Sequence, residues 1–158
     1  MKFSQTASLL ALISALTTTA YADALSSKKN FYLITCVDKY EGDYDAIAYY
    51  ADGPQPKALD WPEKVGKVSS TVSSWEGKTR EAKIYNDNWF KAKIAKGADT
   101  LKTGDIAGTG DFEGEPFVCF KEAGTILYSA SDITCKQKYW CPSVSVSKPS
   151  TVRRAFRA

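Results

Sequence analysis

Residues 104–121, GDIAGTGDFEGEPFVCFK, are the stretch that most resembles a chemical site, because Gly108, Gly110 and Gly114 lie among acidic side chains. A phosphate-binding glycine loop leaves a strand and opens a helix, whose first amide groups hold the anion. Here the sequence after Gly114 is that of a strand, and the acidic neighbours would repel phosphate. Their spacing does not match a calcium loop either. We therefore predict a turn between two antiparallel strands, in which the glycines supply positive φ angles.

The chain contains no histidine. This excludes Ser-His-Asp and Cys-His nucleophiles, histidine-ligated metals and the histidine acid and base of secreted ribonucleases. A paired-carboxylate glycosidase remains, with Asp111, Glu113 or Glu115 opposite Asp43 or Asp45 as the nominal pairs. Solvated turn residues are the simpler interpretation of these five carboxylates. We therefore predict a protein that is not an enzyme and that needs no metal or other cofactor.

Aromatic side chains are the next candidates for a site. Most tryptophans and tyrosines of a small β-fold fill its core. Trp61 lies in a proline-flanked loop, and Trp75 lies at the end of a hairpin expected between residues 64–75 and 78–85. Either side chain could stack on a sugar or on a partner protein. Because side chains alternate across a strand, at most one of Tyr49 and Tyr50 is a surface residue. We assign Tyr50 to the binding surface together with Trp61 and Trp75.

The first residues of the chain predict export. Lys2, the apolar residues 9–16 and the small-residue site Ala20-Tyr21-Ala22 form the pattern of a signal peptide, so residues 1–22 are expected to be removed. The apolar run is shorter than the about 20 residues that cross a bilayer. We expect a secreted, extracellular protein.

Four cysteines, Cys36, Cys119, Cys135 and Cys141, all follow the predicted cleavage site. An even number in a secreted chain indicates disulfides rather than zinc, whose ligands usually come in close pairs. Three pairings are possible. We favour Cys36 with Cys119, which joins two strand-like segments, and Cys135 with Cys141, which closes a short loop. On the loop-closure model the long bridge contributes about 4 to 5 kcal/mol and the short one about 2 kcal/mol.

The remaining residues read as one β-rich domain. After removal of 22 of the 158 residues, about 136 remain, which is one domain by length. Short segments with β-type alternation are separated by regular turn signals, and no segment has a sustained helical period. We predict an all-β fold, a small antiparallel β-barrel or β-sandwich stapled by two disulfides, over residues 30–144. The strand-like segments include residues 30–40, 46–52, 64–75, 78–85, 89–95, 115–121 and 125–131.

The ends of the chain are expected to lie outside this domain. Residues 23–29 read as a short propeptide-like or disordered segment, and the basic tail, residues 145–158, as disordered. Arg153 and Arg154 in this tail are candidate contacts for an anionic surface, and they and Lys28-Lys29 form dibasic pairs that processing proteases can cut. Without Lys2 and the four basic tail residues, the domain carries a net charge of −2 (16 − 18), which argues against a nucleic-acid-binding face.

A resemblance rests on the signal peptide, the four cysteines and the pattern YLITC, AYY, FVCF and CKQKYWCP. The chain resembles the small secreted cysteine-containing proteins of filamentous fungi, many of which are effectors or elicitors that act in virulence on a plant host. The resemblance implies a disulfide-stapled β-fold that acts by binding, in the apoplast or inside host cells, and it transfers no catalytic residue.

The expected function is therefore that of a non-enzymatic effector or elicitor that binds a host protein or a cell-wall polysaccharide. We expect a monomer or weak homodimer, no nucleic-acid partner and no stable membrane insertion. The alternative is a carbohydrate-binding, lectin-like protein or a weak carboxylate-dependent glycosidase.

Overall fold

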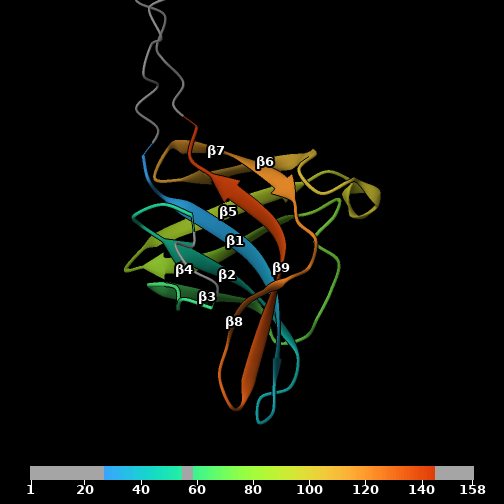
Figure 1. Cartoon of the computed structure of the whole chain (residues 1–158). Helices are drawn as coiled ribbons and strands as arrows, with labels where there is room; N and C mark the ends of the chain where they lie inside the picture. Colours follow the sequence, from blue (N-terminus) through green and yellow to red (C-terminus); the bar gives the residue numbers. More distant parts are fainter. Residues whose placement is uncertain (1–26, 55–58, 145–158) are drawn as a thin grey trace, which may run out of the picture.

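The computed structural model describes residues 27–54 and 59–144, and this part of the chain is almost entirely β-structure (Figure 1). The all-β prediction is thus confirmed. The predicted signal peptide and the basic tail with Arg153 and Arg154 lie outside the described residues. The strands are β1 (Asn30–Asp38), β2 (Tyr44–Tyr50), β3 (Lys64–Ser69), β4 (Thr79–Tyr85), β5 (Asn88–Ile94), β6 (Ile106–Phe112), β7 (Glu115–Lys121), β8 (Ile126–Ser129) and β9 (Ile133–Pro142), with a 3₁₀ turn η1 at Ala98–Thr100.

The strands form a nearly closed antiparallel barrel in the order β3-β2-β1-β9-β7-β6-β5-β4, and β8 pairs with β9 outside this path. The two edge strands, β3 and β4, approach each other at Gly66. A Cβ atom added there would lie 2.6 Å from the carbonyl oxygen of Lys83 and 2.7 Å from Cβ of Ala82. A glycine at this position therefore lets the backbones of the two edges meet.

The expected hairpin between residues 64–75 and 78–85 is wrong. Strand β3 ends at Ser69, and the following residues cross from one edge of the barrel to the other. There Glu76 forms a parallel β-bridge with Ile94 of β5. The alternation of valine with polar residues extends past Ser69 in the sequence. Only the residues up to Ser69 pair with a neighbouring strand, which is β2.

Two apolar clusters stabilise the fold. The larger fills the barrel, where the ring of Phe31 stacks on that of Phe90 with centroids 3.9 Å apart. The smaller lies outside the barrel, where Leu127 and Tyr128 of β8 cover the outer face of β1, β2 and β9. Strand β2 is consequently buried on both faces, and its Tyr50 is only 5% exposed. The prediction that the ring of Tyr50 is exposed is therefore wrong, because the segment around Asp60 lies against this ring and accepts a hydrogen bond from its hydroxyl.

The disulfides join Cys36 to Cys135 and Cys119 to Cys141, with Cα atoms 4.0 Å apart in each pair. Two disulfides are confirmed, but the favoured pairing is wrong. Its supposed loop is strand β9, in which Cys135 and Cys141 are about 20 Å apart. A disulfide requires Cα atoms within about 7 Å. Each bridge instead joins cysteines on neighbouring strands, and Cys36 lies directly opposite Cys135.

The turn predicted in residues 104–121 is confirmed. Glu113 and Gly114 connect β6 to β7 with positive φ angles of 56° and 78°. Gly108 and Gly110 have a different role from the one expected, because both lie within β6. A Cβ at Gly108 would lie 2.2 Å from the carbonyl oxygen of Lys93, so this glycine allows close packing of β5 against β6.

Candidate functional site

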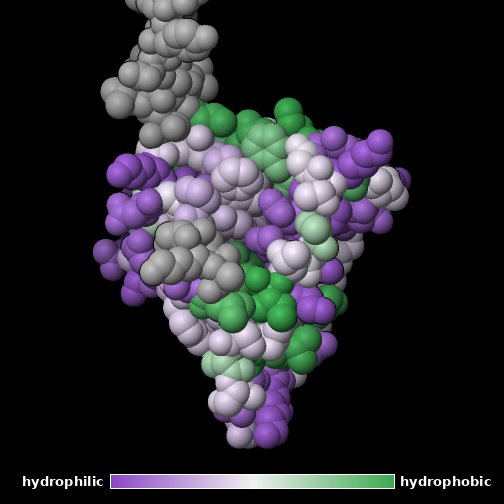
Figure 2. Space-filling view, viewed as in Figure 1, coloured by the Kyte–Doolittle hydropathy of each residue, from purple (hydrophilic) through white to green (hydrophobic). Residues whose placement is uncertain are grey.

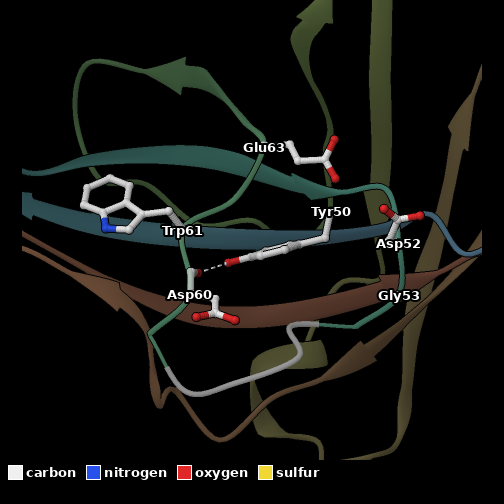
Figure 3. A pocket seen from close by; sticks show the side chains of 6 residues that line it. All are labelled: Tyr50, Asp52, Gly53, Asp60, Trp61 and Glu63. Carbon is white, nitrogen blue, oxygen red and sulfur yellow. Dashed lines mark hydrogen bonds between the residues drawn. The ribbon is translucent and has the colours of Figure 1, made fainter.

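A hollow of about 290 Å³ lies beside the end of β2 and the segment that leads into β3 (Figure 3). We call it the Trp61 hollow. Figure 3 shows the ring of Tyr50 across its middle, with the indole of Trp61 at one side. In the space-filling view, apolar surface gathers over the neighbouring β8 (Figure 2). The hollow is lined by Tyr50, Asp52, Gly53, Asp60, Trp61 and Glu63.

Trp61 is exposed and yet held in place. Its side chain is 57% exposed, while its ring contacts that of Tyr128 with centroids 4.7 Å apart. The hydroxyl of Tyr50 donates a hydrogen bond of 2.7 Å to the carbonyl oxygen of Asp60, the residue before Trp61. Burial raises the pKa values of the Tyr50 and Tyr128 phenols, so both rings are neutral at physiological pH. The indole therefore presents a fixed apolar face to solvent.

The polar part of the hollow is acidic. Among the described residues that line the hollow, Asp52, Asp60 and Glu63 contribute three carboxylates and none is basic. Glu63 is positioned by the backbone amide of Ala51, which donates to its Oε1 atom at 2.9 Å, and by the hydroxyl of Tyr85 at 3.5 Å from Oε2. An aromatic face beside carboxylates suits a cationic group, which is attracted by both.

Trp75 is not a surface residue, contrary to the prediction. It is 3% exposed and belongs to the cluster inside the barrel. The Arg80 guanidinium lies 5.5 Å from the centroid of the Trp75 ring. The buried Nε1 atom of Trp75 has no hydrogen-bond partner among the described residues. The sequence placed Trp75 at a hairpin end, but the segment before β4 turns its side chain into the core. Of the predicted surface aromatics, only Trp61 is exposed.

A second hollow, of about 340 Å³, lies at the end of the barrel crossed by the segment between β3 and β4. Its Glu76 carboxylate accepts hydrogen bonds from the hydroxyl groups of Tyr139 and Ser74. Burial opposes ionisation of Glu76, but these hydrogen bonds hold the pKa of its carboxyl below its usual range. They tie the crossing segment to β9, so we interpret them as structural.

The carboxylates considered for a glycosidase do not form the nominal pairs in the contacts of the described residues. Asp45 is fully buried, and it accepts hydrogen bonds from the hydroxyl of Thr35 at 2.8 Å and the amide of Ser73 at 2.9 Å. Asp43 is exposed in the turn between β1 and β2. Asp111 and Glu113 line a hollow on the outer face of β5 and β6, and the three strands β1, β9 and β7 lie between β2 and β6.

Glu115 has a structural role as well. Its carboxylate accepts a hydrogen bond from the hydroxyl of Ser143 and lies 3.1 Å from Nζ of Lys29. It therefore joins the residues before β1 to those after β9. The dibasic pair Lys28-Lys29 is thus partly engaged in the fold.

Sequence reasoning missed Trp89 as a site residue. It is 43% exposed on β5, beside Asp111 and Glu113. The signal was present, because Trp89 alternates with the buried Phe90 in a strand whose other outward residues are Lys91 and Lys93. An aromatic residue on the lysine-bearing side of an alternating strand indicates an exposed ring.

A scan against protein-family models found no match to this chain, and searches of curated proteins and of solved structures found none either. Within residues 27–54 and 59–144, no helix is long and apolar enough to cross a bilayer. The same residues contain no group of three or more metal-binding side chains arranged around one point. The two disulfides are compatible with an extracellular environment.

Proposed function

We propose that this protein is a secreted, non-enzymatic binding protein of the effector or elicitor kind, and that it binds a host protein through the Trp61 hollow. The observation that carries the proposal is the fixed exposure of Trp61, which is 57% exposed as a residue while the ring of Tyr128 contacts one side of its indole. Exposed aromatic side chains of this kind are typical anchors of protein interfaces.

The ligand group that suits this hollow is a lysine or arginine side chain. A cation over an indole face is stabilised by about 0.5 to 2 kcal/mol, depending on its desolvation. Asp52, Asp60 and Glu63 add negative charge to the lining of the same hollow. Because Tyr50 and Tyr128 already hold Asp60 and Trp61, little conformational entropy of these two residues is lost on binding.

Export is supported by the signal-peptide pattern of residues 1–22 and by the two disulfides, which persist in oxidising compartments. The host apoplast is the compartment in which we expect the protein to act.

The first test uses the oxidised protein from residue 23 onward, infiltrated into leaves, with cell death and reactive oxygen as the response. Trp61→Ala is expected to abolish the response, and Trp89→Ala, at the other exposed tryptophan, to retain it. Both substitutions are at exposed positions, so both variants should keep the melting temperature of the parent protein within a few degrees. A folded Trp61→Ala variant with full response would contradict the proposal.

A second test addresses the chemistry of the hollow directly. Titration with a tetra-arginine peptide is expected to change tryptophan fluorescence in the parent protein and to bind at least tenfold more weakly to Trp61→Ala. A tetra-glutamate peptide is the charge control and should not bind. Equal binding of tetra-arginine to both proteins would remove the Trp61 hollow as a cation site.

A further inference from the structure

The outer face of β4, β5 and β6 carries a second exposed tryptophan, Trp89. On this face the outward side chains of β5 are Trp89, Lys91 and Lys93, while Phe90 and Ile94 point into the barrel. Trp89 lies opposite Lys83 of β4. The indole offers a large flat apolar face with one polar N–H group, which makes this exposed ring a candidate contact for a ligand.

Two adjoining hollows, of about 240 and 210 Å³, run along this face. They share Lys91 and Asp111, which lie opposite each other on β5 and β6, and together we call them the Trp89 groove. The groove is lined by Thr79, Asp87, Asn88, Trp89, Lys91, Ala92, Lys93, Thr109, Gly110, Asp111, Glu113 and Gly114.

Backbone contributes to the floor of the smaller hollow. Ala92 and Gly110, which both line it, lie opposite each other on β5 and β6. Ala92 is buried, and a Cβ on Gly110 would point into the barrel, 2.5 Å from the ring of Phe90. Outward side chains on either side of this pair form the walls, so peptide groups and polar side chains line the same channel.

The charge along the groove is mixed. Two lysines and three carboxylates contribute to the lining, and Lys91 also lies 3.7 Å from Glu81. A polyanion such as a nucleic acid needs a basic stripe, and a polycation needs an acidic one. Neutral hydroxyl groups both donate and accept hydrogen bonds, so they can pair with lysines, threonines and carboxylates alike.

The length of the groove points to a chain rather than to a single small molecule. From Trp89 to Lys93 the strand rises by about 13 Å at 3.3 Å per residue. The apolar C–H face of a sugar ring can cover the indole of Trp89. This contact removes apolar surface of both the sugar and the tryptophan from water.

We propose that the Trp89 groove binds a neutral oligosaccharide, with Trp89 as the platform for one sugar ring and the polar walls as partners for the hydroxyl groups of the next rings. This site is separate from the Trp61 hollow, with which it shares no lining residue.

Isothermal titration of the oxidised protein with chitohexaose, laminarihexaose and xylohexaose tests this proposal. We expect saturable binding of at least one of them, and at least tenfold weaker binding of the corresponding disaccharide. Trp89→Ala should weaken the hexasaccharide at least tenfold, whereas Trp61→Ala should bind as the parent does. Thr109→Arg, which fills the groove at an exposed position without altering Trp89, should also abolish binding.

Lack of binding to all three hexasaccharides would overturn the proposal. Undiminished binding by a folded Trp89→Ala or Thr109→Arg variant would do the same. Tighter binding of an acidic oligosaccharide, such as a hexagalacturonate, with a strong dependence on salt would show that the groove selects charge instead. Because Trp61→Ala is expected to keep this activity, failure here leaves the function proposed for the Trp61 hollow standing.

Discussion

Cys135 and Cys141 lie near the two ends of strand β9, and their side chains belong to different apolar clusters. Cys135 is in the cluster outside the barrel and Cys141 in the cluster inside it. The strand changes face between them, because Leu33 pairs with Tyr139 whereas Ile34 pairs with Gln137, which leaves one residue of β9 as a bulge. Strand β9 is thus linked by one disulfide to β1 on the outside of the barrel and by the other to β7 on the inside.

The two disulfides should differ in their contribution to stability. The loops that they close span 99 and 22 residues, so the chain-entropy model gives about 4.7 kcal/mol for the first and about 3 kcal/mol for the second. We expect Cys36→Ala/Cys135→Ala to lower the free energy of unfolding more than Cys119→Ala/Cys141→Ala. Urea denaturation measures the free energy of unfolding of each double variant. Peptide mapping under non-reducing conditions should recover these two bridges, and a Cys36–Cys119 peptide would refute the observed pairing.

Gly66→Ala should open the contact between the edges of the barrel. The added Cβ would meet the backbone oxygen of Lys83, which cannot move without shifting β4, so we expect a loss of about 1 to 3 kcal/mol. Amide hydrogen exchange should increase in β3 and β4 before the rest of the barrel. Val65→Ala, at an exposed position of the same strand, is the control and should change stability by less than about 0.5 kcal/mol. Equal stability of both variants would refute the close contact.

Substitutions of Trp75 should affect stability through its volume and not through its N–H group. Trp75→Ala removes a buried ring and should cost about 3 to 5 kcal/mol. Trp75→Phe should cost clearly less, because the Nε1 atom of Trp75 donates a hydrogen bond to no group of the described residues. Guanidinium denaturation measures the free energy of unfolding of the Trp75→Ala and Trp75→Phe variants. If Trp75→Phe were as destabilising as Trp75→Ala, Nε1 would have a partner that the structure lacks.

Glu115 should make stability depend on pH. Burial opposes its ionisation, but hydrogen bonds from Ser143, Ser27 and Lys29 and the charge of Lys29 hold the pKa of its carboxyl below the usual 4.5. A carboxyl whose pKa is lowered on folding adds stability above its unfolded pKa, and this contribution is lost as the pH falls through the folded value.

We therefore expect Glu115→Gln to lower the free energy of unfolding by about 1 to 2 kcal/mol at pH 7. The difference from the parent protein should shrink below pH 4.5. Urea denaturation from pH 7 to pH 3 follows this change. Glu81→Gln, in an exposed ion pair with Lys91, is the control and should show less than about 0.5 kcal/mol at every pH. A difference that stays constant down to pH 3 would show that the charge of Glu115 contributes nothing.

The sequence by itself determined the elements and their local features. Alternation of apolar and polar residues predicted most strands, because a half-buried strand repeats every two residues. Gly114 marked the turn between β6 and β7, since this turn needs positive φ angles. The same alternation placed Trp89 on an outward face. The number of cysteines predicted two disulfides.

Only the tertiary structure decided which segments lie side by side. The pairing of β9 with β1 and β7 fixed both disulfides, and the segment around Asp60 packed against Tyr50 on what would otherwise be an outer face. The crossing of the segment between β3 and β4 buried Trp75. Each of these outcomes depends on contacts between residues far apart in the chain, and a local pattern records only whether a side chain is buried, not which distant strand buries it.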